Sequence, residues 1–232
     1  MKVFAISDLH LSTNCDKPMD VFGAAWDNYI DKIIFSWNSK VNEEDAVLLC
    51  GDLSWGMKLE DAKADIDIIK ALKGKKIMIK GNHDYWFSSI GKVRTLLDEN
   101  FFAVMHDCVK IENFIFCGSR GWTVPEGNAE LAPEDQKIYL REAERLKLSF
   151  SCVNKIRKEN DKVICLMHFP PFDSRRGDSL FTSIIENNKT DKVVYGHLHG
   201  KDCRGDIKTV KNGIEYFLTS CDLLKHELIQ IM

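Results

Sequence analysis

Residues 76–86 read KIMIKGNHDYW, and the apolar run near their start ends abruptly in three polar side chains. Ile77, Met78 and Ile79 have the continuous apolar character of a strand that is covered on both faces. A glycine follows, and an amide, an imidazole and a carboxylate then come in succession at 82–84. This pattern predicts a buried strand that delivers polar side chains directly past its carboxyl end.

Similar apolar runs recur along the chain and alternate with segments of helical periodicity. The runs predict buried strands at 2–7, 46–50, 76–80, 114–118, 162–168 and 192–196. Helices are expected at 20–38, 58–73, 88–98, 133–158 and 178–188. Alternation of this kind favours an α/β fold with sheets inside and helices outside.

The end of the chain is richer in strand signals. Asn212-Gly213 lies between two strand-like runs, which is the strongest short-range signal for a hairpin, and residues 226–232 predict a final strand. No repeat, low-complexity tract or linker interrupts the 232 residues, although 119–132 is rich in loop formers. We therefore expect a single domain spanning 1–232.

Composition narrows the class of protein. Apolar residues at 44% and charged residues at 29% are typical of a soluble globular protein. Because 32 basic and 35 acidic residues leave a net charge of -3, we expect neither a stable nucleic-acid partner nor a membrane surface as partner. The eight cysteines form no C-x-x-C pair, so free, mostly buried thiols in a reducing cytoplasm are expected.

Polar side chains that can bind metals follow five of the predicted strands. Because the ligand crevice of an open α/β sheet lies outside the carboxyl ends of its strands, these side chains should assemble at one edge. They are Asp8 and His10, Asp52, Asn82 and His83, His168, and His197 and His199. A mixed set of nitrogen and oxygen ligands without thiolate favours manganese, iron or zinc over magnesium or calcium alone.

These positions resemble the five-block signature of the calcineurin-like metallophosphoesterases. The blocks occur in the family's order and are Asp8-Leu9-His10, Gly51-Asp52, Gly81-Asn82-His83-Asp84, His168 and Gly196-His197-Leu198-His199. The resemblance implies a four-layer α/β/β/α sandwich, in which helices flank two mixed β-sheets.

The resemblance also implies a dinuclear centre of two manganese, iron or zinc ions with a bridging hydroxide as nucleophile. One ion would be held by Asp8, His10 and His199, the other by Asn82, His168 and His197, and Asp52 would bridge them. His83 would face the scissile phosphoryl group as a general acid or transition-state stabiliser. Asp84 is the second candidate catalytic residue, although it would either orient a neighbouring group or cap a turn.

The second block departs from the protein-phosphatase branch of the family, which continues it as G-D-x-x-D-R-G. Trp55 and Gly56 stand here in place of the second aspartate and the arginine. Other residues would then have to bind the substrate in place of that aspartate and arginine. The candidates are Arg120, Arg175, Arg176, Trp55 and Trp122. The alternative is that the arginines are solvated surface residues and the tryptophans are core aromatics.

The expected function is that of a cytoplasmic, metal-dependent phosphoester hydrolase. Its partner would be a small phosphorylated molecule or nucleotide, and we favour phosphodiesters over monoesters. The alternatives are a nuclease and a Ser/Thr phosphoprotein phosphatase. A binding module of the same fold without activity is disfavoured, because all seven ligand positions and His83 are present.

Overall fold

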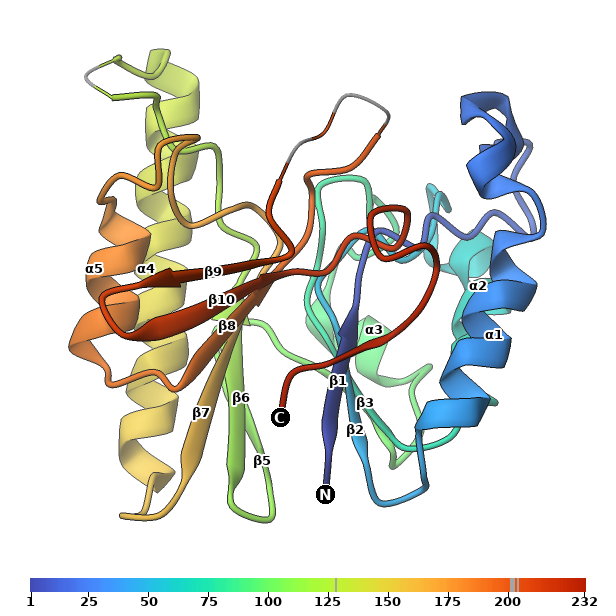
Figure 1. The fold of residues 1–232 in the computed structure, drawn as a ribbon, viewed down its shortest axis with the longest axis horizontal. Coiled ribbons are helices and arrows are strands. Elements are labelled where there is room, and N and C mark those ends of the chain that lie inside the picture. Colours follow the sequence, from blue (N-terminus) through green and yellow to red (C-terminus); the bar gives the residue numbers. More distant parts are fainter. Residues whose placement is uncertain (128, 201–202, 204) are drawn as a thin grey trace.

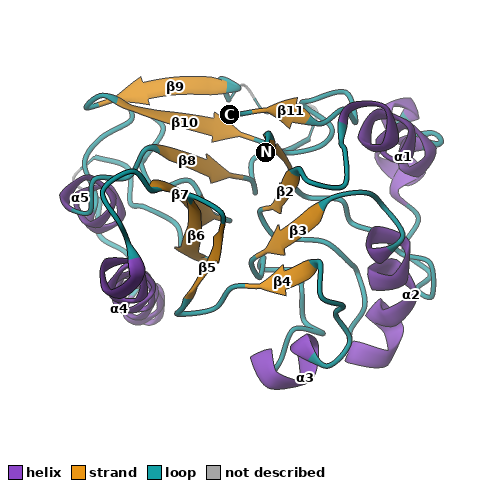
Figure 2. Cartoon of the chain, turned by 90° about the horizontal axis from the view of Figure 1, so that it is seen from below, coloured by secondary structure: helices purple, strands orange, loops and turns teal. Residues whose placement is uncertain are grey.

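A computed structural model describes residues 1–127, 129–200, 203 and 205–232. Its strands form two mixed sheets that pack against each other, and helices cover the outer faces (Figure 1). Figure 2 shows one group of helices beside the first sheet, α1 (Tyr29–Lys40), α2 (Leu59–Lys70) and α3 (Ile90–Arg94), and another beside the second, α4 (Pro133–Ile156) and α5 (Leu180–Asn187). The predicted fold class is confirmed.

The first sheet has the strand order β11-β1-β2-β3-β4. Four strands run parallel, namely β1 (Val3–Ile6), β2 (Ala46–Leu49), β3 (Lys75–Met78) and β4 (Phe101–Ala103). The two-residue strand β11 (Ile229–Gln230) pairs antiparallel with β1 and returns the end of the chain to this sheet. Because β1 to β4 share one direction, their carboxyl ends lie at the same edge.

The second sheet has the order β5-β6-β7-β8-β10-β9. Its parallel strands are β6 (Phe114–Ser119), β7 (Lys162–Met167), β8 (Lys192–Tyr195) and β10 (Ile214–Leu218). Antiparallel strands close both sides, β5 (Cys108–Ile111) and β9 (Lys208–Lys211). The predicted hairpin at Asn212-Gly213 joins β9 to β10, and both turn residues have the positive φ of a type I′ turn.

The two sheets bury a common apolar layer. Ala5 and Leu48 of the first sheet belong to one buried cluster with Phe116 and Leu166 of the second. A separate cluster joins the other face of each sheet to its own helices. Each central strand is therefore covered on both faces, which explains the continuous apolar runs in the sequence.

The helix predicted at 20–38 is interrupted in the structure. Two short 3-10 turns, η1 (Met19–Phe22) and η2 (Ala24–Trp26), precede α1. Gly23 between them has a φ of 115°, and Asn28 before α1 has a φ of 51°, so neither residue continues a right-handed helix. Strands β4 and β5 were not predicted from the sequence, and the helix predicted at 88–98 shortens to α3.

The expectation that all cysteines are free thiols was wrong for one pair. Cys108 of β5 and Cys152 of α4 form a disulfide, with their Cα atoms 5.9 Å apart. Strand β5 packs beside α4, which brings together two cysteines 44 residues apart in sequence. The other six cysteines are free, and four of them are buried. No helix of the described residues is long and apolar enough to cross a membrane.

Candidate metal centre

The carboxyl ends of five strands from the two sheets converge on one cluster of side chains. Asp8, His10 and His199 each place one potential ligand atom within 4.8 Å of the others. Asp8, Asp52 and His168 form a second group by the same measure. Residues that follow β1 and β2 thus meet residues that follow β7 and β8, as the strand-end pattern predicts.

Asn82 completes the side of the cluster that faces the second sheet. Its Oδ1 atom lies 2.6 Å from His168 Nε2 and 3.0 Å from His197 Nδ1. Asp52 lies between the two halves, because its Oδ2 atom is 3.4 Å from His168 Nε2 and 3.9 Å from His10 Nε2. This intermediate place is the one that the family resemblance implies for a bridging carboxylate.

One oxygen of Asp52 receives no hydrogen bond from the part of the chain that the structure describes. Asp52 Oδ1 accepts the backbone N–H of His83 at 2.7 Å, whereas the buried Oδ2 atom has no hydrogen-bond partner among the described residues. Burial and the nearby carboxylates of Asp84 and Asp8 raise the pKa of Asp52 to about 9. Without a counter-charge the buried carboxyl would keep its proton near neutral pH, and a bound cation would supply the charge that stabilises the ionised form.

The imidazoles of the cluster favour their neutral form. Burial lowers the pKa of both His168 and His197 to about 4. Burial, reinforced by His199, also holds the pKa of His10 well below its ordinary value. Neutral imidazole is the form that binds metal ions, so these nitrogens and the carboxylate and amide oxygens fit a divalent transition metal.

The orientation of His168 is fixed from behind. Its Nδ1–H group donates to the carbonyl oxygen of Cys50 at 2.9 Å, which leaves Nε2 as the unprotonated nitrogen that faces the cluster. Space for this arrangement depends on Gly51, where a Cβ atom would lie 2.7 Å from His168 Nδ1 and 2.7 Å from the Cα of Gly81. Gly51 of the second sequence block and Gly81 of the third therefore pack directly against each other.

The backbone at the cluster is held in a conformation that non-glycine residues rarely adopt. Four predicted ligands have positive φ angles, Asp8 at 56°, His10 at 48°, Asp52 at 52° and His197 at 69°. Each left-handed residue costs roughly 1–2 kcal/mol, so the surrounding structure must enforce these angles. Such over-determined geometry is typical of preorganised functional sites.

The sequence profile described as "Calcineurin-like phosphoesterase" matches residues 1–201. The chain belongs to the calcineurin-like phosphoesterase family. Among solved structures, it is similar to AQ665 from Aquifex aeolicus, a protein of unknown function, with 15% identity, a TM-score of 0.53, and coverage of 99% of this chain and 95% of that one. This similarity concerns the fold.

A second solved structure, Vacuolar Protein Sorting 29 from Cryptosporidium parvum, aligns with 14% identity and a TM-score of 0.37, over 93% of this chain and 72% of that one. No curated protein matches the sequence.

In this calcineurin-like phosphoesterase, Asp84 lies behind the cluster instead of facing a substrate. It is 1% exposed, and its carboxylate accepts five hydrogen bonds. The donors are the backbone N–H groups of Gly81, Asp52, Leu53 and Ser54 and the Nε1–H of Trp86. Asp84 thus ties the loop carrying Asp52 to the loop carrying Asn82, which agrees with the orienting role expected for it, and a direct part in catalysis stays a prediction.

His83 adjoins the cluster without joining either group of ligands. Its half-buried ring lies 5.7 Å from the ring of His10 and 4.7 Å from that of Trp55, measured between centroids. Burial and the neighbouring His199 lower the pKa of His83. The imidazole is thus placed beside the centre, as the resemblance implies for a group that meets the substrate.

Trp55 is part of the wall of the centre. Its ring stacks on His10 at 4.6 Å and an interplanar angle of 21°, and its Nε1–H donates to Met19 Sδ at 3.2 Å. Trp122 packs instead on Phe169, with ring centroids 5.1 Å apart, and is half-buried. Both tryptophans therefore make packing contacts next to predicted site residues, and a role in substrate binding stays a prediction.

The three candidate arginines have different surroundings. Arg120 pairs with the buried Glu142 at 3.3 Å and lies over the ring of Trp122, so its guanidinium is already engaged. Its backbone carbonyl accepts the N–H of His168, which links it to the centre through the main chain. Arg176 forms an exposed ion pair with Asp206. Arg175 is exposed.

Ser220 is a further polar residue that follows the carboxyl end of a strand, and the sequence reasoning missed it. Ser220 follows β10, and its hydroxyl donates to Asp8 Oδ2 at 2.8 Å. Ser7 donates to the same oxygen at 2.6 Å, and the N–H of His197 lies 3.0 Å from it. These hydrogen bonds orient Asp8, and the polar end of the FLTS run was the available signal for Ser220.

Proposed function

We propose that this protein is a metal-dependent phosphoester hydrolase that acts on small molecules or nucleotides and prefers phosphodiesters to monoesters. One observation carries the proposal: the buried Oδ2 atom of Asp52 has no hydrogen-bond donor among the described residues and lies between two groups of buried ligand atoms. A cluster that is costly to bury without a cation is well suited to hold one.

The residues divide into two ligand sets around Asp52. One ion would be held by Asp8, His10 and His199, and the other by Asn82, His168 and His197. When bound, two manganese, iron or zinc ions would supply Lewis acidity at the phosphoryl group and lower the pKa of a water for in-line attack. Family membership and the mixed nitrogen and oxygen donor set support this division.

The remaining residues position groups and move a proton. His83 lies outside the ligand sets and close to His10, so its ring N–H is available to protonate the leaving oxygen. Trp55 covers His10 and restricts its ring to one plane. Asp84 holds the N–H of Asp52 and so fixes the carboxylate between the two sets.

The volume of a cavity beside the centre and the net charge of the protein support a small substrate. A cavity of about 780 Å³ adjoins His197 and His199, which lies within the range of small-molecule sites. The net charge of -3 argues against long nucleic acid, which basic surfaces bind. Trp55 and Gly56 replace residues that the protein-phosphatase branch has, which makes a phosphoprotein substrate the weaker alternative.

Metal content tests the proposal first. After reconstitution with manganese or iron and removal of free metal, elemental analysis should find about two ions per chain. Less than about one ion per chain would refute the dinuclear centre. Asp52→Asn should lose metal, whereas His83→Ala should retain it.

Hydrolysis of phenyl and alkyl phosphate monoesters and diesters, whose alcohols are poor leaving groups, tests the roles of the residues. His83→Ala should lower kcat by about 10²–10⁴-fold, because the leaving oxygen would then depart without a proton from His83. His106→Ala, a matched change outside the cluster, should keep activity near that of the native protein. Full activity in His83→Ala would show that the proton-donor role is wrong, and equal residual activity in all variants would identify a contaminant.

A further inference from the structure

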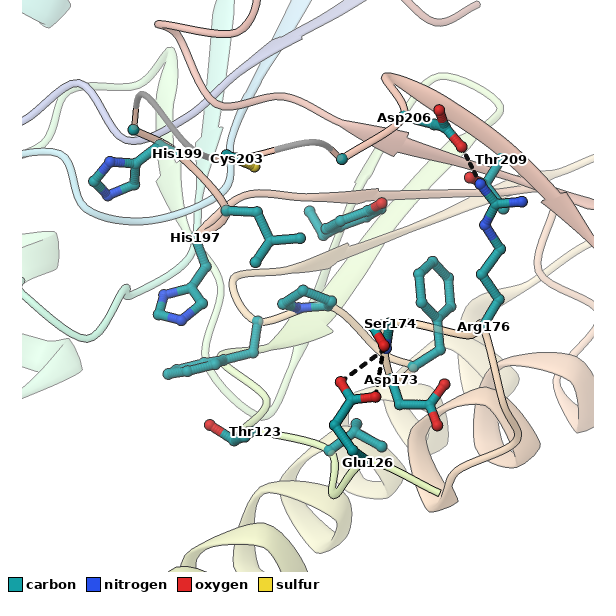
Figure 3. Close-up of a pocket in the computed structure, with 18 residues that line it drawn as sticks. Thr123, Glu126, Asp173, Ser174, Arg176, His197, His199, Cys203, Asp206 and Thr209 are labelled. Carbon is teal, nitrogen blue, oxygen red and sulfur yellow. Dashed lines mark hydrogen bonds and ion pairs between the residues drawn. The ribbon is translucent and has the colours of Figure 1, made fainter.

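A cavity of about 780 Å³ extends away from the metal centre, and its lining begins with His197 and His199 (Figure 3). The ion pair between Arg176 and Asp206 lies at the opposite side of the cavity from these histidines. A molecule that reached the centre with its phosphoryl group would have this cavity beside it for the rest of its structure.

The wall nearest the centre is aromatic and rigid. The ring of Phe169 packs against the ring of His197, with centroids 4.0 Å apart, so the aromatic surface is continuous with the ligand set. Phe172 and Tyr195 line the cavity further on and contact each other edge to face at 5.7 Å. All three rings are at least nine-tenths buried, which fixes a preformed apolar surface for a flat or bulky group.

The charged groups around the cavity are mostly anionic. Glu126, Asp173 and Asp206 line it, and Arg176 is the one lysine or arginine among the described lining residues. Arg176 is already paired with Asp206. A second anionic group on the ligand would therefore find repulsion instead of a free cation.

Local hydrogen bonds hold two of these carboxylates in place. Asp173 accepts backbone N–H groups from Gly177, Gly127 and Arg175, and these bonds hold its pKa below its ordinary value. Glu126 accepts both the N–H and the hydroxyl of Ser174, at 3.0 and 2.6 Å. Both carboxylates are thus fixed in position at the cavity.

We infer that this cavity binds the organic substituent of the phosphoester, and that it selects an uncharged, ring-sized group against one that bears a further negative charge. The inference rests on the proposed function for the identity of the phosphoryl group. An aryl or nucleoside substituent satisfies these conditions, whereas a nucleoside polyphosphate or an oligonucleotide does not.

Phosphonates test the cavity without any hydrolysis, because their carbon–phosphorus bond is not cleaved. The probes are methylphosphonate, phenylphosphonate and 4-carboxyphenylphosphonate, each carrying one organic group. Their binding to the metal-reconstituted protein would be measured by isothermal titration calorimetry. Phenylphosphonate should bind about tenfold or more tighter than methylphosphonate, because the ring removes apolar surface from water. The carboxylate should weaken phenylphosphonate binding about fivefold or more through like-charge repulsion.

Two matched pairs of variants locate the effect. Glu126→Lys should remove the discrimination against the carboxylate, whereas Glu144→Lys, on the exposed surface of α4, should leave it unchanged. Thr123 is an exposed residue of the cavity lining. Thr123→Trp should weaken phenylphosphonate selectively and spare methylphosphonate, whereas Thr123→Ser should alter neither.

The outcomes separate the cavity from the chemistry. Equal affinities for the three phosphonates, no measurable binding, or tighter binding of the carboxylate would overturn the inference. The expected order of affinities with no ester hydrolysed would support the cavity and refute the proposed function. Hydrolysis of esters without any preference among the phosphonates would support the proposed function and refute the role of the cavity.

Discussion

Replacing Asp84 by asparagine tests how the candidate metal centre is assembled. The native carboxylate accepts five N–H groups, two through Oδ2 and three through Oδ1, at 2.8–3.3 Å. Asparagine keeps one oxygen and turns the other position into an NH₂ group, which cannot accept. In Asp84→Asn, at least two buried donors would therefore lose their acceptor, including the N–H of either Asp52 or Leu53.

The magnitude follows from those lost bonds. A hydrogen bond to a charged acceptor contributes about 1.5–3 kcal/mol, so losing two costs roughly 3–6 kcal/mol. Burial raises the pKa of Asp84, and a neutral side chain avoids that desolvation, which offsets part of the loss. We expect the free energy of unfolding to fall by about 3 kcal/mol, which lowers Tm by roughly 6–12 °C for a chain of this size.

Thermal unfolding of metal-free protein, followed by circular dichroism, measures the effect. Asp178→Asn is the control, because that side chain is 81% exposed and its ion pair with Lys211 should contribute less than about 1 kcal/mol. Displacement of Asp52 should also weaken manganese binding by about 10–100-fold, a change that stability alone does not produce. If Asp84→Asn had the same Tm as Asp178→Asn and the manganese affinity of the native protein, the positioning role of Asp84 would be refuted.

Three further predictions concern stability elsewhere. Burial opposes ionisation of Asp45, but two backbone N–H donors outweigh it and hold the pKa of Asp45 below its ordinary value. Its stabilisation is therefore present above a pH of about 4 and lost as pH falls through the folded pKa, so the urea-unfolding difference between native and Asp45→Asn should shrink below pH 4. Glu142→Gln removes the buried partner of three arginines and should cost about 3 kcal/mol in urea unfolding, whereas the exposed Glu144→Gln should cost under about 0.5 kcal/mol. Reduction should lower Tm through the Cys108–Cys152 bond, by an amount corresponding to about 2–4 kcal/mol, and Cys108→Ser should abolish this response to reductant.

Much of the centre could be predicted from the sequence because its residues directly follow buried parallel strands. A buried parallel strand fixes both the direction and the end point of the chain, so a polar residue such as Asp52 or His168 can be placed at the sheet edge without knowing any loop. The apolar runs before them indicate the strands, and the alternation with helices indicates the layers.

Other features depend on contacts that no local pattern encodes. Asp84 binds the N–H of Asp52, 32 residues away, and a turn-capping aspartate has the same local sequence. The disulfide joins residues 44 apart, and the spacing of the cysteines alone does not indicate the packing of β5 on α4. The break before α1 reflects positive φ at Asn28, which overrides an otherwise helical periodicity.

The two sheets each supply one side of the ligand cluster, since Asp52 and Asn82 follow the first sheet while His168 and His197 follow the second. The distance between the two sheets therefore sets the distance between the two groups of ligands. The side chains packed between the sheets determine that distance. A larger or smaller residue at Phe116 would tune metal affinity from a distance, without changing any ligand.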